Sequence, residues 1–176
     1  LGVVASAEHF QRKPEDLEAC LRAFIDETPS LSGLLQNAVW DTPARAINGY
    51  SANVKTLHGQ GFALLGNAAE FLDPVFSSGV TIAMRSASMA AGLLHRQLQG
   101  ETVDWHTEFS VPLKRGVDTF RAYVEGWYEG TFQDVIFHSD SPPEIRRMIS
   151  AILAGYAWDE RNPFVSEAKR RLRVIS

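Results

Sequence analysis

The chain has very little cysteine: Cys20 is the one example among 176 residues. A single cysteine cannot form an internal disulfide framework or a cysteine-rich metal site, so a reducing, cytoplasmic setting is expected. Cys20 falls at a core spacing in a predicted helix. We therefore expect a buried thiol and not a reactive one.

Long apolar runs and a strong charge of one sign are also missing. No apolar run reaches the roughly 18 residues of a membrane span without a polar interruption, so no membrane span is expected. The net charge is −4 and the pI is about 5.7. This balance argues against nucleic acid as a partner, because phosphate binding needs a basic face. The basic tail Lys169–Arg173 is interpreted as a solvated helix face.

Several catalytic motifs are absent as well. The histidines are scattered along the chain, and none forms the i, i+4 pair with a glutamate that a zinc protease needs. There is no Gly-x-Ser-x-Gly elbow, so Ser77 and Ser78 are not obvious nucleophiles. Phosphate-loop and Gly-x-Gly-x-x-Gly dinucleotide-binding patterns are missing too. The sequence thus identifies no catalytic residue and no metal site.

The stretches that are present predict mostly helix. Helices are expected after Lys13-Pro14, over Val80–Leu98, through Val117–Phe132, after Ser141 and from Asn162. Strands are expected at Leu1–Ala7, Arg45–Leu57 and Phe62–Leu65, with a hairpin over Tyr50–Leu65. We therefore expect an α/β or α+β fold dominated by helices. Its strands should belong to two sheets completed by residues outside this chain.

One stretch, Gly61–Met84, organises the rest. A short apolar run ends at Gly66-Asn67, a polar loop carries Asp73-Pro74, and Ser77-Ser78-Gly79 precedes a long helix. Gly66 allows a close backbone approach, and Asn67 follows the strand at its carboxyl end, where open α/β folds bind ligands. The amides that begin a helix can hold an anion or a carbonyl oxygen. The stretch predicts a cofactor-edge site. Asp73 alone is more typical of a turn than of a general base.

Gly61–Met84 resembles the second FAD-binding motif of class A flavoprotein monooxygenase-type enzymes. The resemblance is strongest to the branch that contains flavin-dependent halogenases and geranylgeranyl reductases. In that branch the pattern runs Gly-Asp-Ala-Ala-x-Phe-x-Asp-Pro and continues into a Ser-Ser/Thr-Gly helix start. The Tyr50-Ser51 strand and the aromatic helix at 120–137 are also similar to that branch, and the match is thin elsewhere.

The resemblance implies a role for each matching position. Asn67 stands where the family has an aspartate that accepts hydrogen bonds from the ribityl hydroxyls of FAD. The Asp73-Pro74 turn passes beside the isoalloxazine, and the helix-start amides lie near its pyrimidine edge, where they favour the negative charge of reduced flavin. In halogenases, neighbouring amides also hold the halide. The implied cofactor-binding residues are Gly66, Asn67, Asp73, Pro74, Ser78, Gly79 and Val80.

The sequence departs from the family pattern in two ways. Asn67 replaces the aspartate and loses its charge, which should weaken FAD binding by about 1–2 kcal/mol. The family's Rossmann motif, and the lysine and tryptophan motif used in halogenation, lie upstream of the position that matches Leu1. We therefore expect this chain to be the C-terminal portion of a longer protein. The isolated chain should be inactive and should not hold FAD tightly.

The resemblance implies an FAD-dependent oxidoreductase, monooxygenase-like or halogenase-like, that acts through reduced flavin and O2. A small organic substrate, aromatic or carrier-bound, and a flavin reductase partner are expected. Residues 1–100 would belong to the FAD-binding and substrate domain, and residues 101–176 would form a helical region packed on it. One alternative is a non-catalytic remnant or binding domain that keeps the fold. Another is a helical interaction domain with a partner surface at Trp127, Tyr128 and Phe132.

Overall fold

The computed structural model describes residues 1–138 and 142–175, mostly as helix with a few two-residue strands. The expected helix-dominated class with few strands is confirmed. The chain divides into two compact units, Leu1–Gly49 and Tyr50–Ser176. The expected division at residue 100 remains a proposal.

The first unit consists of three helices, α1 (Ala7–Gln11), α2 (Leu17–Asp26) and α3 (Pro29–Leu35). Asp16 caps α2 by accepting a hydrogen bond from the Ala19 amide at 2.8 Å, as a short polar side chain at this position commonly does. Cys20 is buried, as expected for a structural thiol.

The predicted strand at Leu1–Ala7 is wrong. Residues 1–6 form no regular element, Leu1 is exposed, and Ala7 already begins α1. A strand needs a neighbour for its backbone N–H and C=O groups. The first unit, whose residues the structure describes in full, contains helices and no strand, so this apolar run has nothing to pair with.

The second unit begins with two small antiparallel pairs. Strand β1 (Ala52–Asn53) pairs with β4 (Glu70–Phe71), and β2 (His58–Gly59) pairs with β3 (Phe62–Ala63). The expected hairpin is confirmed at its closed end. The expected long strand Arg45–Leu57 is wrong beyond β1, because its residues are exposed on both faces and gain little from pairing.

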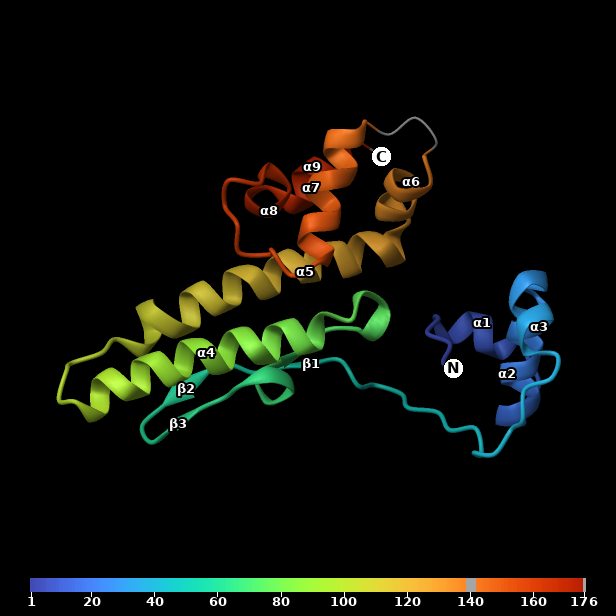
Figure 1. The fold of residues 1–176 in the computed structure, drawn as a ribbon, viewed down its shortest axis with the longest axis horizontal. Coiled ribbons are helices and arrows are strands. Elements are labelled where there is room, and N and C mark those ends of the chain that lie inside the picture. The colour runs from blue at the N-terminus through green and yellow to red at the C-terminus, as the bar shows by residue number, and fades with distance from the viewer. Residues whose placement is uncertain (139–141, 176) are drawn as a thin grey trace. The chain divides into compact units, whose positions relative to one another are not determined.

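Two long helices form the body of this unit, α4 (Ser78–Leu98) and α5 (Val111–Glu129), which lie side by side in Figure 1. A π-helical turn at His106–Ser110 leads into α5. The helices α6 (Thr131–Phe137), α7 (Pro143–Leu153), α8 (Pro163–Ser166) and α9 (Ala168–Ile175) gather around the C-terminal half of α5. Among the described residues, no helix has the length and apolarity to cross a membrane.

The core of the second unit lies between α5 and the C-terminal helices. Tyr123 and Phe132 are fully buried with ring centroids 4.9 Å apart, and the Tyr123 hydroxyl donates to the Phe164 carbonyl at 3.1 Å. Trp127 packs against the same cluster. The hypothesis of a partner surface at Trp127, Tyr128 and Phe132 is therefore wrong, because Phe132 is fully buried in the core and Trp127, partly buried, packs against it.

The basic tail forms α9 and behaves as a solvated face. Lys169 pairs with Glu125 at 2.6 Å, and Arg170 and Arg171 pair with Glu167. Leu172, on the inner side of the same helix, is buried.

Candidate functional site

The residues predicted to form a site all lie on the segment between β3 and the first turn of α4. This segment contains two 3-10 turns, η1 (Gly66–Ala68) and η2 (Pro74–Phe76), with β4 between them. Elements this short do not stand alone, so packing and side-chain bonds fix their position. The exposed members of the predicted set are Asn67, Pro74 and Val80, and the buried members are Gly66, Asp73 and Ser78.

Gly66 anchors the start of the segment against α4. Its φ of 52° is left-handed, and its amide donates to the Ser86 hydroxyl at 3.0 Å, which in turn donates to the Ala83 carbonyl at 3.0 Å. A β-carbon at Gly66 would lie 3.0 Å from the Ala83 β-carbon. The close approach expected at this glycine is therefore made by helix α4.

Asn67 and Gly79, far apart in the predicted loop, come together in the structure. A β-carbon at Gly79 would lie 3.6 Å from the Asn67 Oδ1 atom. The exposed carboxamide of Asn67 therefore lies against the first turn of α4. Because Gly79 has no side chain, this turn is left open next to a group that can both donate and accept hydrogen bonds.

Asp73 holds the next turn. It is 8 % exposed, its Oδ1 accepts the Val75 amide at 2.8 Å, and its Oδ2 accepts the Tyr128 hydroxyl at 2.9 Å. The predicted Asp-Pro turn is confirmed: Asp73 caps η2, with Pro74 at its first position. Both carboxylate oxygens are engaged in holding the loop.

Two tyrosines at this turn were missed from the sequence. Burial, and then the bond to Asp73, raise the pKa of Tyr128 to about 12. Burial, and then the charge and hydrogen bond of Asp73, also raise the pKa of Tyr50. Tyr128 was predicted as part of a partner surface with Trp127 and Phe132. Its hydroxyl was the one feature in the sequence that indicated a hydrogen-bonding role.

Helix α4 begins without a side-chain cap. Ser77 precedes it with a left-handed φ of 51°, and among the described residues no side chain caps the first-turn amides. The N–H groups at Ser78–Val80 therefore stand at the positive end of a 21-residue helix. Such a helix start favours an anionic group or a polarised carbonyl in front of it.

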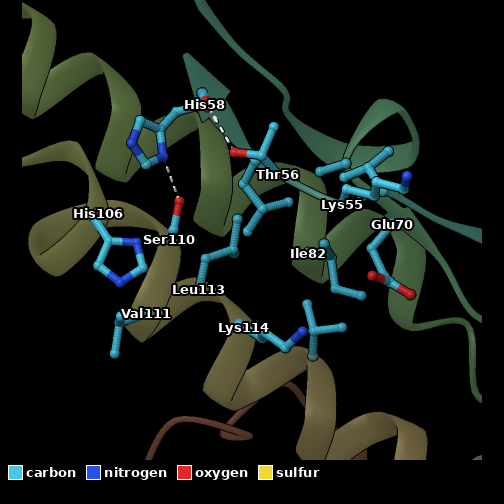
Figure 2. A pocket seen from close by; sticks show the side chains of 14 residues that line it. Lys55, Thr56, His58, Glu70, Ile82, His106, Ser110, Val111, Leu113 and Lys114 are labelled. Atoms are coloured by element: carbon cyan, nitrogen blue, oxygen red, sulfur yellow. Dashed lines mark hydrogen bonds between the residues drawn. The ribbon is translucent and has the colours of Figure 1, made fainter.

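A cavity of about 280 Å³ lies on the buried side of this segment (Figure 2). It is lined by residues 54–58, by Ala69 and Glu70, by Ile82 of α4 and by residues between His106 and Val117. At one side of it, the His58 Nδ1 atom lies 2.7 Å from the Ser110 Oγ atom. Sequence reasoning did not find this cavity, because its residues come from four separate stretches of chain.

An ion pair ties the segment to α5 next to the cavity. Glu70 is 9 % exposed and accepts from the Arg121 guanidinium at 2.5 Å. A nearly buried carboxylate needs such a partner, because an unpaired buried charge is costly. The pair fixes β4 and the middle of α5 relative to each other.

No family model matches the chain. It is 24 % identical over 174 residues to the chlorinase of 1H-pyrrole-2-carbonyl-peptidyl-carrier protein from Pseudomonas fluorescens, a match that covers 98 % of this chain and 38 % of the relative. It is 33 % identical over 104 residues to a tryptophan 2-halogenase from Chondromyces crocatus, covering 57 % of this chain and 20 % of the relative. The chain therefore spans well under half the length of these relatives.

A solved structure shares the fold of nearly the whole chain. The crystal structure of a flavoprotein/dehydrogenase from Cytophaga hutchinsonii matches with a TM-score of 0.91 and 38 % identity, over 97 % of this chain and 43 % of that one. These matches confirm the resemblance drawn from Gly61–Met84, and they identify the chain as a homologue of the C-terminal portion of flavin-dependent halogenases.

Proposed function

We propose that this chain forms one wall of the flavin site in an FAD-dependent oxidoreductase of the halogenase type. The observation that carries the proposal is the pairing of Asn67 with the open, uncapped start of α4 at Gly79. This pairing falls within the stretch that resembles the family's second FAD motif, and the relatives are flavin-dependent halogenases. FAD bound there would supply the redox chemistry.

The residues present fit this cofactor in distinct ways. The first-turn amides of α4 would face the flavin and favour its reduced, negatively charged form. Asn67 would bond the ribityl hydroxyls through its carboxamide, and Val80, 71 % exposed, would offer an apolar surface to the ring. The buried residues Gly66, Asp73 and Ser78 would act by holding the segment in place.

An exposed apolar face on α4 supports a role as part of a larger enzyme. Val80, Met84, Leu94 and Leu98 are between 48 % and 76 % exposed. Their spacing of four, ten and four residues brings them to one side of the helix. Contiguous exposed apolar surface usually marks an interaction site. In the proposed enzyme, Val80 contacts the flavin, and further polypeptide belonging to the FAD domain covers the rest of this face, from Met84 to Leu98.

The substrate and the electron donor are part of the proposal. Two relatives are named for a pyrrole carbonyl group on a peptidyl-carrier protein, and a third for tryptophan. We infer a small aromatic substrate, free or carrier-bound, and O2 as co-substrate. A flavin reductase partner would supply the reduced flavin.

Asn67 favours a second candidate, a binding domain that keeps the fold without turnover. The family's aspartate is replaced by an amide, which removes a charge from the ribityl contact and weakens it. Such a protein would bind FAD, but the bound flavin would not be reduced by NADPH or by a flavin reductase.

The proposal is tested on the protein expressed from its complete gene and reconstituted with excess FAD. We expect FAD to raise the melting temperature and to give a bound-flavin absorption spectrum. Gly79→Val should abolish both effects, because a branched side chain would fill the space between α4 and Asn67. Gly92→Val is the matched control, since Gly92 lies in the same helix with open space around it.

The outcomes separate the candidates. A wild-type protein with no flavin spectrum and no change in melting temperature contradicts both of them. Binding that survives Gly79→Val contradicts the assigned face. Bound flavin that a reductase with NADPH cannot reduce favours the binding domain over the oxidoreductase.

A further inference from the structure

The cavity lined by residues 54–58, Ala69, Glu70, Ile82 and residues between His106 and Val117 carries charged, apolar and hydrogen-bonding groups. Lys55 and Lys114 line it, and among the described residues neither lysine forms an ion pair. Glu70, which lines the same cavity, is already paired with Arg121 at 2.5 Å. The cavity therefore carries unbalanced positive charge in a chain whose net charge is −4. Local charge of one sign in a concave site attracts a ligand of the other sign.

The cavity also has an apolar wall. Among its lining residues, Leu57 is partly buried and Val54 and Val111 are 38 % and 42 % exposed, whereas Ile82, Leu113 and Val117 are buried in the core beside it. The space of about 280 Å³ is close to the lower end of small-molecule sites, which run from about 300 to 1,000 Å³. These properties suit a small organic molecule with an apolar body.

Hydrogen-bonding groups lie on the other side of the cavity. Figure 2 shows His58, His106 and Ser110 on one side and Lys55 with Glu70 on the other. Ser110 fixes the His58 ring at 2.7 Å, and the two imidazole centroids are 6.2 Å apart. The ring nitrogens not bonded to Ser110 can donate to or accept from a ligand.

Two other uses of these side chains fit less well. A serine–histidine nucleophile needs a third group to orient the histidine, and no carboxylate bonds His58 in the part of the chain that the structure describes. The described residues also contain no group of three histidine, cysteine, aspartate or glutamate side chains that would complete a metal site. Binding is the use that the arrangement supports.

We propose that this cavity binds a small amphipathic carboxylate. Its apolar body would lie against Val54, Leu57 and Val111, and its carboxylate would meet the ammonium groups of Lys55 and Lys114. A polar group on the ligand would face His58 and His106. The apolar lining favours an anion carried on an apolar body over a small, fully hydrated ion such as inorganic phosphate.

The test uses phenylacetate, its neutral twin phenylacetamide, and inorganic phosphate. Binding to the protein expressed from its complete gene is measured by calorimetry, with NMR signals of the Leu57 and Val111 methyls and the His58 and His106 rings to locate the probe. We expect phenylacetate to bind about tenfold or more tightly than phenylacetamide, because one charge-assisted contact is lost in the amide.

The Lys55→Gln/Lys114→Gln variant should lose this preference for the acid. Both lysines are exposed, so the core is unchanged. Lys13→Gln/Lys169→Gln removes the same charge from two lysines that do not line the cavity, and it should keep the preference. Equal binding of acid and amide, or a preference that survives loss of Lys55 and Lys114, overturns the proposal. Tighter binding of inorganic phosphate than of phenylacetate overturns the choice of ligand class.

Discussion

Asp73 shows how one side chain positions a loop. A nearly buried carboxylate is costly unless its oxygens are bonded. Here one oxygen accepts from the Val75 amide and the other from the Tyr128 hydroxyl. Tyr128 lies near the end of α5, so this bond fixes the loop before α4 to a second helix. The position of the α4 start therefore depends on Tyr128, which lies 55 positions from Asp73 in the sequence.

Tyr128 should make stability depend on pH in the alkaline range. Its folded-state pKa of about 12 lies above the ordinary value of 10.0. The folded state therefore keeps the proton longer than the unfolded chain. The contribution of Tyr128 to stability is fully present below about pH 10 and is lost as the pH rises through about 12. We expect Tyr128→Phe to remove one hydroxyl from the late part of the tyrosinate absorbance titration.

Tyr128→Phe should also destabilise the protein at neutral pH by about 1 kcal/mol. This loss of stability is small because the Tyr128 side chain is half exposed. Urea unfolding measures this change, and Tyr156→Phe serves as a control because Tyr156 is more exposed and bonds no carboxylate among the described residues. An unchanged late titration in Tyr128→Phe contradicts the assignment.

At the scale of elements, close packing against α4 fixes the position of the turn η1. Gly66→Ala should destabilise the protein by about 2–4 kcal/mol. About 1–2 kcal/mol comes from a side chain in the left-handed conformation, and the rest comes from forcing the new methyl against Ala83. Thermal or urea unfolding measures the loss.

Gly92→Ala is the comparison, because it should change the free energy of unfolding in the opposite direction. Gly92 lies inside α4, and a β-carbon added there would meet nothing within 4 Å. Alanine should therefore stabilise the helix by about 0.5–1 kcal/mol. If Gly66→Ala is as stable as the wild type, the close packing of η1 on α4 is not needed for the fold.

The accuracy of the sequence-based predictions differs between helices and strands. The long helix α4 was predicted to within two residues of its start, because small and apolar residues persist over many turns. The strand at Leu1–Ala7 was predicted from a short apolar run, and the strand along Arg45–Leu57 was predicted from loose alternation. Both stretches are largely exposed, so no buried face was there to stabilise a strand.

The candidate site was predictable where its residues are contiguous. Gly66, Asn67 and the start of α4 belong to one stretch, and a motif can describe them. The partners that hold this stretch were not predictable, because Ser86, Arg121 and Tyr128 meet it only through the packing of α4 and α5. The same holds for the cavity, where His58 meets Ser110 across 52 residues of sequence.

At the scale of the molecule, the two compact units have very different cores. In Leu1–Gly49, Cys20 and Ile25 are the buried apolar residues. The unit Tyr50–Ser176 buries an aromatic and aliphatic cluster around Phe120, Tyr123 and Phe132. Stability rises with the surface that a unit buries, and small units bury a smaller fraction of it. The first unit should therefore be the less stable of the two.

This difference predicts two unfolding transitions in urea. Trp40 belongs to the first unit, where it stacks with Arg22, whereas Trp105, Trp127 and Trp158 belong to the second. In protein labelled with fluorotryptophan, the Trp40 resonance should reach its midpoint at a urea concentration lower by roughly 1 M or more. Trp40→Phe assigns that resonance and should leave the later transition unchanged. A single midpoint shared by all four resonances would show that the core of the first unit does not set its stability.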